Sequence, residues 1–259
     1  MHKAENQLNF LEAHESADPT QEKSRAIDPD MSVIEALYTR HSARGYLDKP
    51  IPEEVLKSDP DQDALMIGRL FGLKRNGYFL FFGALDPKKN INRIIEAYLA
   101  SGSETPLVLV GARDWGMAEE KKSLADGVSI QGHSISDDRI MKLDYMPRAL
   151  LFRLIRTAKA VLFPSLYEGF GLPALEAIQL GTPVISSTTS SLPEVVGAAG
   201  LLVDPYSVPA IAQAIGKLDS DEALRRQLIA ATPAQAGKFS DAHYRARLTQ
   251  LYETTLQQE

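Results

Sequence analysis

From Tyr78 onward, short apolar runs alternate with segments of helical spacing, and this alternation constrains the fold more than any other feature. The apolar runs are residues 78–85, 106–112, 158–165, 182–187 and 199–204. Each run is rich in Val, Leu, Ile and Phe at consecutive positions, which is typical of strands buried on both faces of a parallel sheet. The intervening segments place apolar residues three and four positions apart, as amphipathic helices do. Residues 77–259 are therefore predicted to form an α/β domain, a doubly wound parallel sheet with right-handed crossovers.

The residues before this domain differ in character. Residues 1–30 are polar and charged without a sustained period, which predicts a disordered tail. Residues 31–58 place apolar side chains on one side of a predicted helix, and Pro50 and Pro52 stop that helix from continuing. Residues 59–76 are interpreted as a linker with a short helix.

Composition excludes several classes of function. A formal net charge of -6 and a pI near 5.5 argue against a nucleic-acid surface or a polybasic membrane anchor. The sequence contains no cysteine, so disulfides, thiolate nucleophiles and cysteine-ligated metals are excluded. No apolar run approaches the roughly 20 residues of a membrane span, and the first residues lack the apolar core of a signal peptide. We therefore expect a cytoplasmic protein.

The stretch PSLYEGFGLPALEA, residues 164–177, joins a predicted strand to a predicted helix. Gly169 and Gly171 permit backbone conformations and a close approach that a Cβ would block, and Pro173 suits the first turn of the helix. The start of a helix carries free N–H groups and a partial positive charge, which favour a phosphate. The amides expected to face a ligand are those of Phe170, Gly171 and Leu172.

Two glutamates flank this turn. Glu176 lies about one turn into the helix, where an ionised carboxylate can accept two hydrogen bonds from the vicinal diol of a ribose. Glu168 precedes the turn and is placed to meet hydroxyl groups beyond the phosphates. Together they predict a site for a nucleoside-diphosphate sugar. Both glutamates also have an ordinary explanation, because acidic residues near a helix start are favoured by the helix dipole and glycines are common in loops.

Residues 78–112 and 164–208 resemble the donor-binding half of retaining GT-B glycosyltransferases, and the resemblance extends from about Gly77 to Leu256. It implies a Rossmann-like domain and hexosyl transfer from UDP- or GDP-hexose to a glycan or lipid acceptor in polysaccharide biosynthesis. It also assigns Glu168 to the donor hexose, as the candidate catalytic residue, and Glu176 to the ribose. The implied donor-binding residues are Gly83, Lys89, which would pair with the diphosphate, Leu143 near the base, and the backbone of Gly169, Phe170, Gly171 and Leu172.

The sequence departs from the family pattern at two positions. Many members carry an arginine directly after the glycine of the first strand, as a second cation for the diphosphate, and Ala84 stands there. Lys88 or a residue from elsewhere is expected to compensate. Asp144 occupies a position where the family usually has glycine, close to the expected base contacts.

The N-terminal part suggests a different origin. Residues 31–56 resemble the first helix of flavin-dependent nitroreductases, whose arginine–x–serine–x–arginine phosphate clip is matched by Arg40, Ser42 and Arg44. One helix cannot enclose a flavin ring, since such pockets cover most of their ligand's surface. Because only 76 residues precede Gly77, we expect a joined fragment that lacks the N-terminal acceptor domain of a GT-B enzyme.

Three functions remain open from the sequence. The first is a glycosyltransferase whose missing half comes from a protein partner, or which self-associates through its exposed inter-domain face. The second is a non-catalytic nucleotide-sugar-binding module, and the less favoured third is an FMN-dependent nitroreductase. No cofactor and no metal are expected. The acidic run at residues 59–63 resembles the start of a calcium loop, but Ala64 and Leu70 replace its glycine and its bidentate glutamate.

Overall fold

The computed structural model describes residues 51, 53–84, 86–112, 128–130, 133–135 and 137–256. The predictions of a tail at residues 1–30 and of a flavin-type clip at Arg40, Ser42 and Arg44 lie outside the described residues.

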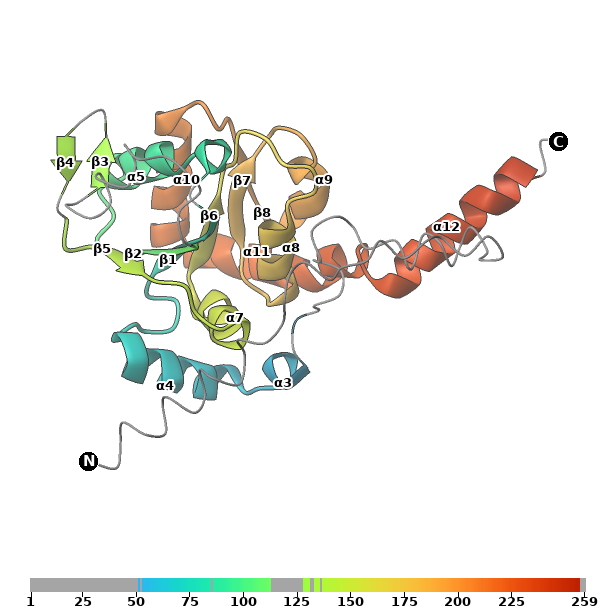
Figure 1. The fold of residues 1–259 in the computed structure, drawn as a ribbon, viewed down its shortest axis with the longest axis horizontal. Coiled ribbons are helices and arrows are strands. Elements are labelled where there is room, and N and C mark those ends of the chain that lie inside the picture. Colours follow the sequence, from blue (N-terminus) through green and yellow to red (C-terminus); the bar gives the residue numbers. More distant parts are fainter. Residues whose placement is uncertain are drawn as a thin grey trace, which may run out of the picture. The chain divides into compact units, whose positions relative to one another are not determined.

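A six-stranded parallel sheet forms the centre of the fold, with the strand order β5-β2-β1-β6-β7-β8 (Figure 1). Every apolar run predicted as a strand is a strand of this sheet, so the doubly wound fold class is confirmed. The sequence did not predict the edge strand β5, nor the separate antiparallel hairpin of β3 and β4. The strands are β1 Phe79–Ala84, β2 Leu107–Ala112, β3 Val128–Ile130, β4 His133–Ile135, β5 Ile140–Leu143, β6 Ala160–Phe163, β7 Val184–Ser187 and β8 Gly200–Val203.

Helices connect β1 to β2 and each strand from β5 to β8 to the next, as the alternating pattern predicts. Those between or after the strands are α5 Ile91–Ala100, α7 Arg148–Thr157, α8 Leu172–Gln179, α9 Leu192–Val196, α10 Val208–Ser220, α11 Glu222–Gly237 and α12 Asp241–Leu256. Two helices precede the sheet, α3 Glu53–Leu56 and α4 Pro60–Phe71, and two single turns of 3-10 helix are η3 Pro87–Lys89 and η4 Gly197–Ala199.

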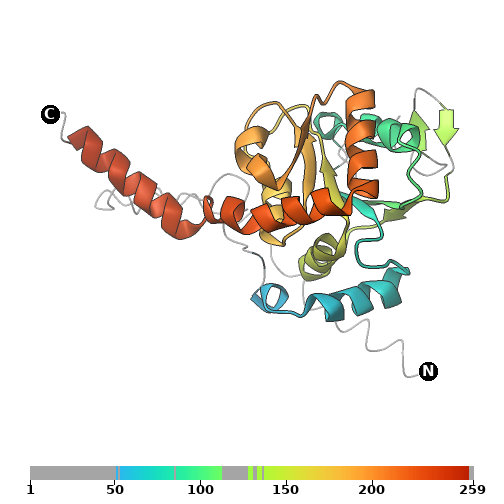
Figure 2. The same cartoon turned by 180° about the vertical axis from the view of Figure 1, so that it is seen from behind.

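Side chains of β1 alternate between two apolar layers, because successive residues of a strand point to opposite faces. Leu80 and Phe82 are buried with residues of α4, α7, α8 and α9. Phe79 and Phe81 are buried on the other face with residues of α5 and α10. Figures 1 and 2 show these helices on the two sides of the sheet. The sheet is therefore covered on both faces, which explains its unbroken apolar strands.

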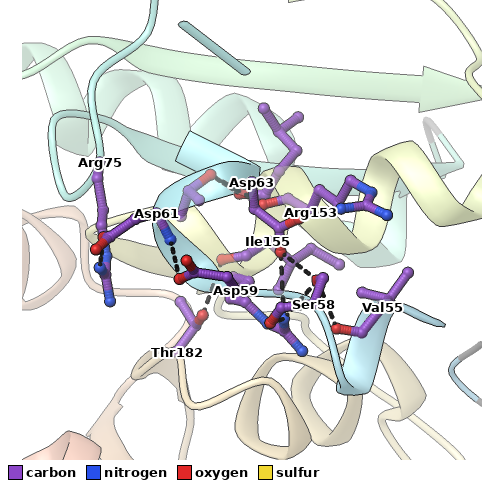
Figure 3. Close-up of polar contacts among 12 residues, drawn as sticks. Val55, Ser58, Asp59, Asp61, Asp63, Arg75, Arg153, Ile155 and Thr182 are labelled. Carbon is purple, nitrogen blue, oxygen red and sulfur yellow. Dashed lines mark hydrogen bonds and ion pairs between the residues drawn. The ribbon is translucent and has the colours of Figure 1, made fainter. Parts of the chain in front are cut away.

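Helix α4 is held against α7 by a buried carboxylate, drawn in Figure 3. Asp63 is fully buried and forms ion pairs with Arg153 and Arg156 of α7. It also accepts a hydrogen bond from the Ser58 hydroxyl at 2.8 Å. Ile67, one turn further along α4, is fully buried in the same apolar layer. A carboxylate without solvent contact requires such partners, since an unpaired buried charge is strongly unfavourable.

The structure thus differs from the predicted linker at residues 59–76. The short helix expected there is 12 residues long and belongs to the compact unit, which begins at Ile51 rather than at residue 77. The acidic run that resembled a calcium loop has structural roles. Asp59 caps α4 by accepting from the amide of Asp61 at 2.9 Å, and Asp63 forms the pairs with α7.

We expect Asp63→Asn to lower the free energy of unfolding by about 3 kcal/mol or more, because it leaves two guanidinium groups without their carboxylate. The matched control is Asp61→Asn in the same helix. Asp61 pairs with Arg75 at 2.6 Å in solvent, so its loss should cost about 0–1 kcal/mol. Urea unfolding of both variants measures the difference. Equal stabilities would show that the α4–α7 pair does not anchor the helix.

Candidate ligand-binding site

The candidate site lies where the strand order changes direction. From β1 the chain runs outward to β2 and β5, then returns to β6 on the other side of β1 and continues to β7 and β8. The segment after β1 leads to α5 on one face, and the segment after β6 leads to α8 on the other. Ligands of such sheets bind at the carboxyl ends of the strands, at this switch point. The sequence predicted site residues in both segments.

The turn before α8 has the backbone that its glycines predict. Gly171 is the N-cap residue, with φ of 98° in the left-handed region, and Pro173 lies in the first turn. Pro173 has no amide hydrogen, and the amides of Ala174 and Leu175 donate to the Gly171 carbonyl oxygen at 3.0 and 3.1 Å. The start of α8 therefore offers an anion the amide of Leu172 and the positive end of the helix dipole. At Gly169 an added Cβ would have no atom within 4 Å. The turn therefore has room for close approach of a ligand.

Two serines of the β7–α9 segment hold this turn in place. The Ser190 hydroxyl oxygen accepts a hydrogen bond from the amide of Glu168 at 3.1 Å. The Ser191 hydroxyl lies within hydrogen-bond distance of two carbonyl oxygens, that of Glu168 at 3.1 Å and that of Phe170 at 2.8 Å. The Phe170 ring packs edge-on against Phe239, with ring centroids 5.6 Å apart. The turn is thus fixed from two sides.

Lys89 and Glu168, predicted separately from the sequence, meet in the structure. Lys89 Nζ lies 2.5 Å from Glu168 Oε1, and their side chains are only 13% and 11% exposed. The ammonium group also lies 4.8 Å from the centroid of the Phe163 ring, a cation–π arrangement. These contacts bring the segments after β1 and β6 together. The pair therefore places an ammonium group, which can bind a phosphate, next to a carboxylate, which can accept hydrogen bonds from hydroxyl groups.

Glu176 is paired with a residue that the sequence did not indicate. Arg148 Nη2 of α7 donates to Glu176 Oε1 at 2.7 Å, and the Glu176 side chain is 14% exposed. Burial raises the pKa of Glu176 above its ordinary value, while the charge and the hydrogen bond of Arg148 act in the opposite direction. Each of the two glutamates thus has its own cation, Lys89 for Glu168 and Arg148 for Glu176.

The remaining predicted residues lie at the same edge of the sheet. Gly83, near the end of β1, has φ of 136°, a conformation that favours glycine, and an added Cβ there would meet nothing within 4 Å. Leu143 is the last residue of β5 and is half-buried. Tyr145, two residues later, is 75% exposed. Lys88, expected to compensate for Ala84, pairs with Asp86 at 3.2 Å.

Comparison with known proteins identifies the family. Residues 53–235 match the family model described as glycosyl transferases group 1. The chain belongs to this family. The sequence prediction is thereby confirmed at the level of the family, and the match begins before α4, in agreement with the structural start of the domain.

Among relatives of this glycosyltransferase family member, the O-antigen chain mannosyltransferase B of Escherichia coli is 38% identical over 182 residues, which is 69% of this chain and 46% of the relative. A D-inositol 3-phosphate glycosyltransferase of Corynebacterium glutamicum (strain R) is 32% identical over 188 residues, which is 69% of this chain and 44% of the relative. The chain thus spans about half the length of these two curated relatives.

Solved structures show the same fold. Anabaena Alr3699/HepE in complex with UDP-glucose superimposes with a TM-score of 0.62 and 22% identity, covering 80% of this chain and 55% of that chain. The C-terminal domain of a group 1 glycosyltransferase (LpcC) from Francisella tularensis gives a TM-score of 0.54 and 21% identity. That match covers 70% of this chain and 92% of the domain. The Rossmann-like GT-B assignment of the domain is confirmed.

Within the part of the chain that the structure describes, no helix is both long and apolar enough to cross a membrane. Within the same residues, His, Asp and Glu side chains do not gather in groups of three or more that could hold a metal ion.

We expect Gly171→Ala to lower the free energy of unfolding by about 1–2 kcal/mol, because alanine is disfavoured at a positive φ. Its Cβ would also lie 2.6 Å from Leu192 Cδ2. Gly169→Ala in the same turn is the control and should change stability by less than about 0.5 kcal/mol, since its Cβ meets nothing. Urea unfolding of both variants tests this. A Gly171→Ala variant as stable as the control would contradict the left-handed cap.

Proposed function

We propose that the described domain binds a UDP- or GDP-hexose and presents it for hexosyl transfer to a glycan or lipid acceptor in polysaccharide synthesis. The observation that carries this proposal is the Lys89–Glu168 pair at the switch point, directly before the open turn of α8. A nucleoside-diphosphate sugar offers, in order, a base, a ribose diol, two phosphates and a hexose. The site offers a partner for each part.

The diphosphate fits the turn before α8 together with Lys89. Backbone amides at a helix start and a lysine ammonium are both common phosphate ligands. During transfer the bond between the hexose C1 and the diphosphate oxygen breaks, and negative charge develops on the leaving diphosphate. Donors that are already fixed around that oxygen would stabilise this charge without reorganisation.

The two glutamates fit the two sugars. Glu168 is proposed to accept from hexose hydroxyls and Glu176 from the ribose diol, while Leu143 at the end of β5 would contact the base. Glu168 is paired with Lys89 at 2.5 Å. A donor that brings phosphate to Lys89 and hydroxyl groups to Glu168 replaces both partners at once, so neither charge is left unpaired. A ligand that has only a phosphate, or only hydroxyl groups, would leave either Glu168 or Lys89 without a partner.

Two comparisons support the choice of ligand. Anabaena Alr3699/HepE, which has the same fold, was solved with UDP-glucose. The E. coli relatives are named as mannosyltransferases, which favours mannose as the transferred hexose. Because the chain spans about half the length of the O-antigen relative, donor binding is the step on which the domain can be tested directly.

Calorimetric titration with UDP-glucose, UDP, GDP-mannose and GDP tests the proposal, and we expect saturable binding of one of the two pairs. Lys89→Met should weaken binding of the diphosphate by about 1.5–3 kcal/mol, the range for hydrogen bonds to a charged group. Binding of the nucleoside monophosphate, which lacks the second phosphate, should weaken less.

Lys89→Met also leaves Glu168 without its cation, so a Lys89→Met/Glu168→Gln double variant controls for an unpaired buried charge. If the parent protein binds none of the four ligands, the proposed function is wrong. If Lys89→Met lowers the affinity for the nucleoside diphosphate and the nucleoside monophosphate equally, Lys89 does not contact the second phosphate.

Gly169→Ala tests the turn itself. Its Cβ would occupy space that is open in the structure, where the phosphate is proposed to approach the backbone. We expect a variant with the parent's unfolding free energy but roughly tenfold weaker binding of the nucleoside diphosphate, or about 1.4 kcal/mol. Unchanged affinity in titration would show that no ligand approaches Gly169.

A further inference from the structure

Arg148 occupies a position that its own helix disfavours. It is the first residue of α7, and positive charge is unfavourable at a helix N-terminus because of the helix dipole. Its guanidinium carbon lies 4.8 Å from the centroid of the Phe152 ring, one turn further along α7. The side chain as a whole is 31% exposed. The Phe152 ring offsets part of this cost, but α7, with the sequence RALLFRLIRT, has no carboxylate to pair with the guanidinium group.

The reason lies on α8. Arg148 Nη2 donates to Glu176 Oε1 at 2.7 Å, and the planar guanidinium group, supported by the Phe152 ring, fixes the direction of that bond. A carboxylate held at one oxygen can rotate less than a free one. Its second oxygen, Oε2, adds further acceptor sites for a ligand.

We propose that Arg148 is a positioning residue: it orients Glu176 so that the carboxylate distinguishes a ribose, with its vicinal hydroxyls, from a 2′-deoxyribose. This inference rests on the proposed function, in which Glu176 binds the sugar of the nucleotide. Arg148 acts through Glu176 rather than on the transferred hexose. The ligand class that it selects is a ribonucleoside diphosphate.

Arg148 also favours the ionised form of Glu176, which accepts from both hydroxyls. Burial raises the pKa of Glu176, and Arg148 opposes that shift. Helices α7, α9 and α11 and strands β6 and β7 pack against α8. Among their described residues, Arg148 is the charged group that acts on the pKa of this carboxyl. Without it, Glu176 would stay protonated to a higher pH and would lose an acceptor.

The test compares the affinities for GDP and 2′-deoxy-GDP, or for UDP and 2′-deoxy-UDP, in variants of Arg148. We expect the parent to prefer the ribonucleotide by roughly tenfold, as a hydrogen bond to a charged group implies. Arg148→Met keeps an apolar side chain beside Phe152. It should bring the ratio of ribonucleotide affinity to deoxyribonucleotide affinity close to the ratio in Glu176→Gln. Arg148→Lys, which keeps the charge, should restore part of the ratio.

Arg153→Met is the matched control, because it removes an arginine–carboxylate pair from the same helix. Arg153 pairs with Asp63 of α4, and Arg156 still pairs with Asp63 in this variant. It should lower stability yet leave the ribose preference unchanged. A loss of preference in Arg153→Met equal to that in Arg148→Met would show that α7 packing, not Arg148, sets the ratio.

The pH dependence separates positioning from a general loss of structure. In Arg148→Met the ribose preference should recover in part as the pH is raised, because Glu176 ionises again but is no longer held in direction, whereas Glu176→Gln should show no recovery. Full recovery at high pH would show that Arg148 acts through the charge of Glu176 and not through its orientation. Protonation of the phosphates affects both nucleotides alike, so it cancels in the ratio.

One outcome would contradict the proposed function, and a different outcome would contradict only the role of Arg148. A parent that binds no nucleotide would contradict the proposed function and this inference with it. A parent that binds with a clear ribose preference, together with an Arg148→Met variant that keeps the full preference at every pH, would overturn the role of Arg148 alone.

Discussion

The side chain of Asn90 connects three segments on which the whole site depends. It is 3% exposed, and its Nδ2 donates to the carbonyl oxygens of Pro164 at 2.9 Å and Pro205 at 2.7 Å. These carbonyls follow β6 and β8, while Asn90 itself ends the turn η3 after β1. Its φ of 63° is a left-handed conformation that asparagine tolerates better than most residues. One amide therefore ties together the ends of three strands.

The positions of the site residues follow from this connection. Lys89 immediately precedes Asn90, and the amide of Leu166, two residues after Pro164, donates to the carbonyl oxygen of Lys88 at 2.8 Å. With the two segments held at this distance, Lys89 and Glu168 can pair at 2.5 Å. A loop pair without such links would have to lose conformational entropy on binding a ligand. Here much of that ordering is supplied by contacts within the protein itself.

Asp63, Glu168 and Glu176 form ion pairs that are buried or nearly buried, with different consequences. The Asp63 pairs join α4 to α7 and leave a fully buried carboxylate with no access for a ligand. The pairs of Glu168 and Glu176 lie at the carboxyl edge of the sheet, and both glutamates keep some exposure. An ion pair of this kind contributes little net stability, because desolvation offsets the attraction. In the proposed function, the Lys89–Glu168 pair keeps both charges in place until polar groups of a ligand replace them, whereas Arg148 continues to orient Glu176 in the complex.

How far the sequence predicted the structure depended on whether a feature is local. The buried strands and long helices can be predicted because composition and period are local features of the sequence, and the segment INRIIEAYLA, which has helical spacing, is α5. Strand β5 was missed because it has four residues at a sheet edge, three half-buried and one exposed, and so lacks a continuous apolar run. Helix α4 was taken for part of a linker because its anchor, Asp63, depends on arginines about 90 residues away.

The same limit applies to the site. The glycines, Lys89 and both glutamates lie in motifs that a single sequence displays, and the structure brings Lys89 to Glu168. Arg148 and the two serines, Ser190 and Ser191, act across 28, 22 and 23 residues of chain, respectively, through contacts that no local pattern encodes. An arginine at a helix start, where the dipole disfavours it, was the one available signal for Arg148.

Hydrogen–deuterium exchange with and without a saturating nucleoside-diphosphate hexose tests the central claim most directly, because it reports on the whole backbone without assuming a site. Binding at the switch point predicts slower exchange in residues 86–90, 142–148 and 164–176. Helix α4, residues 60–71, should exchange as in the free protein. Protection confined to α4 or to other segments away from the strand ends, with saturable binding demonstrated, would contradict a donor site at the junction of β1 and β6.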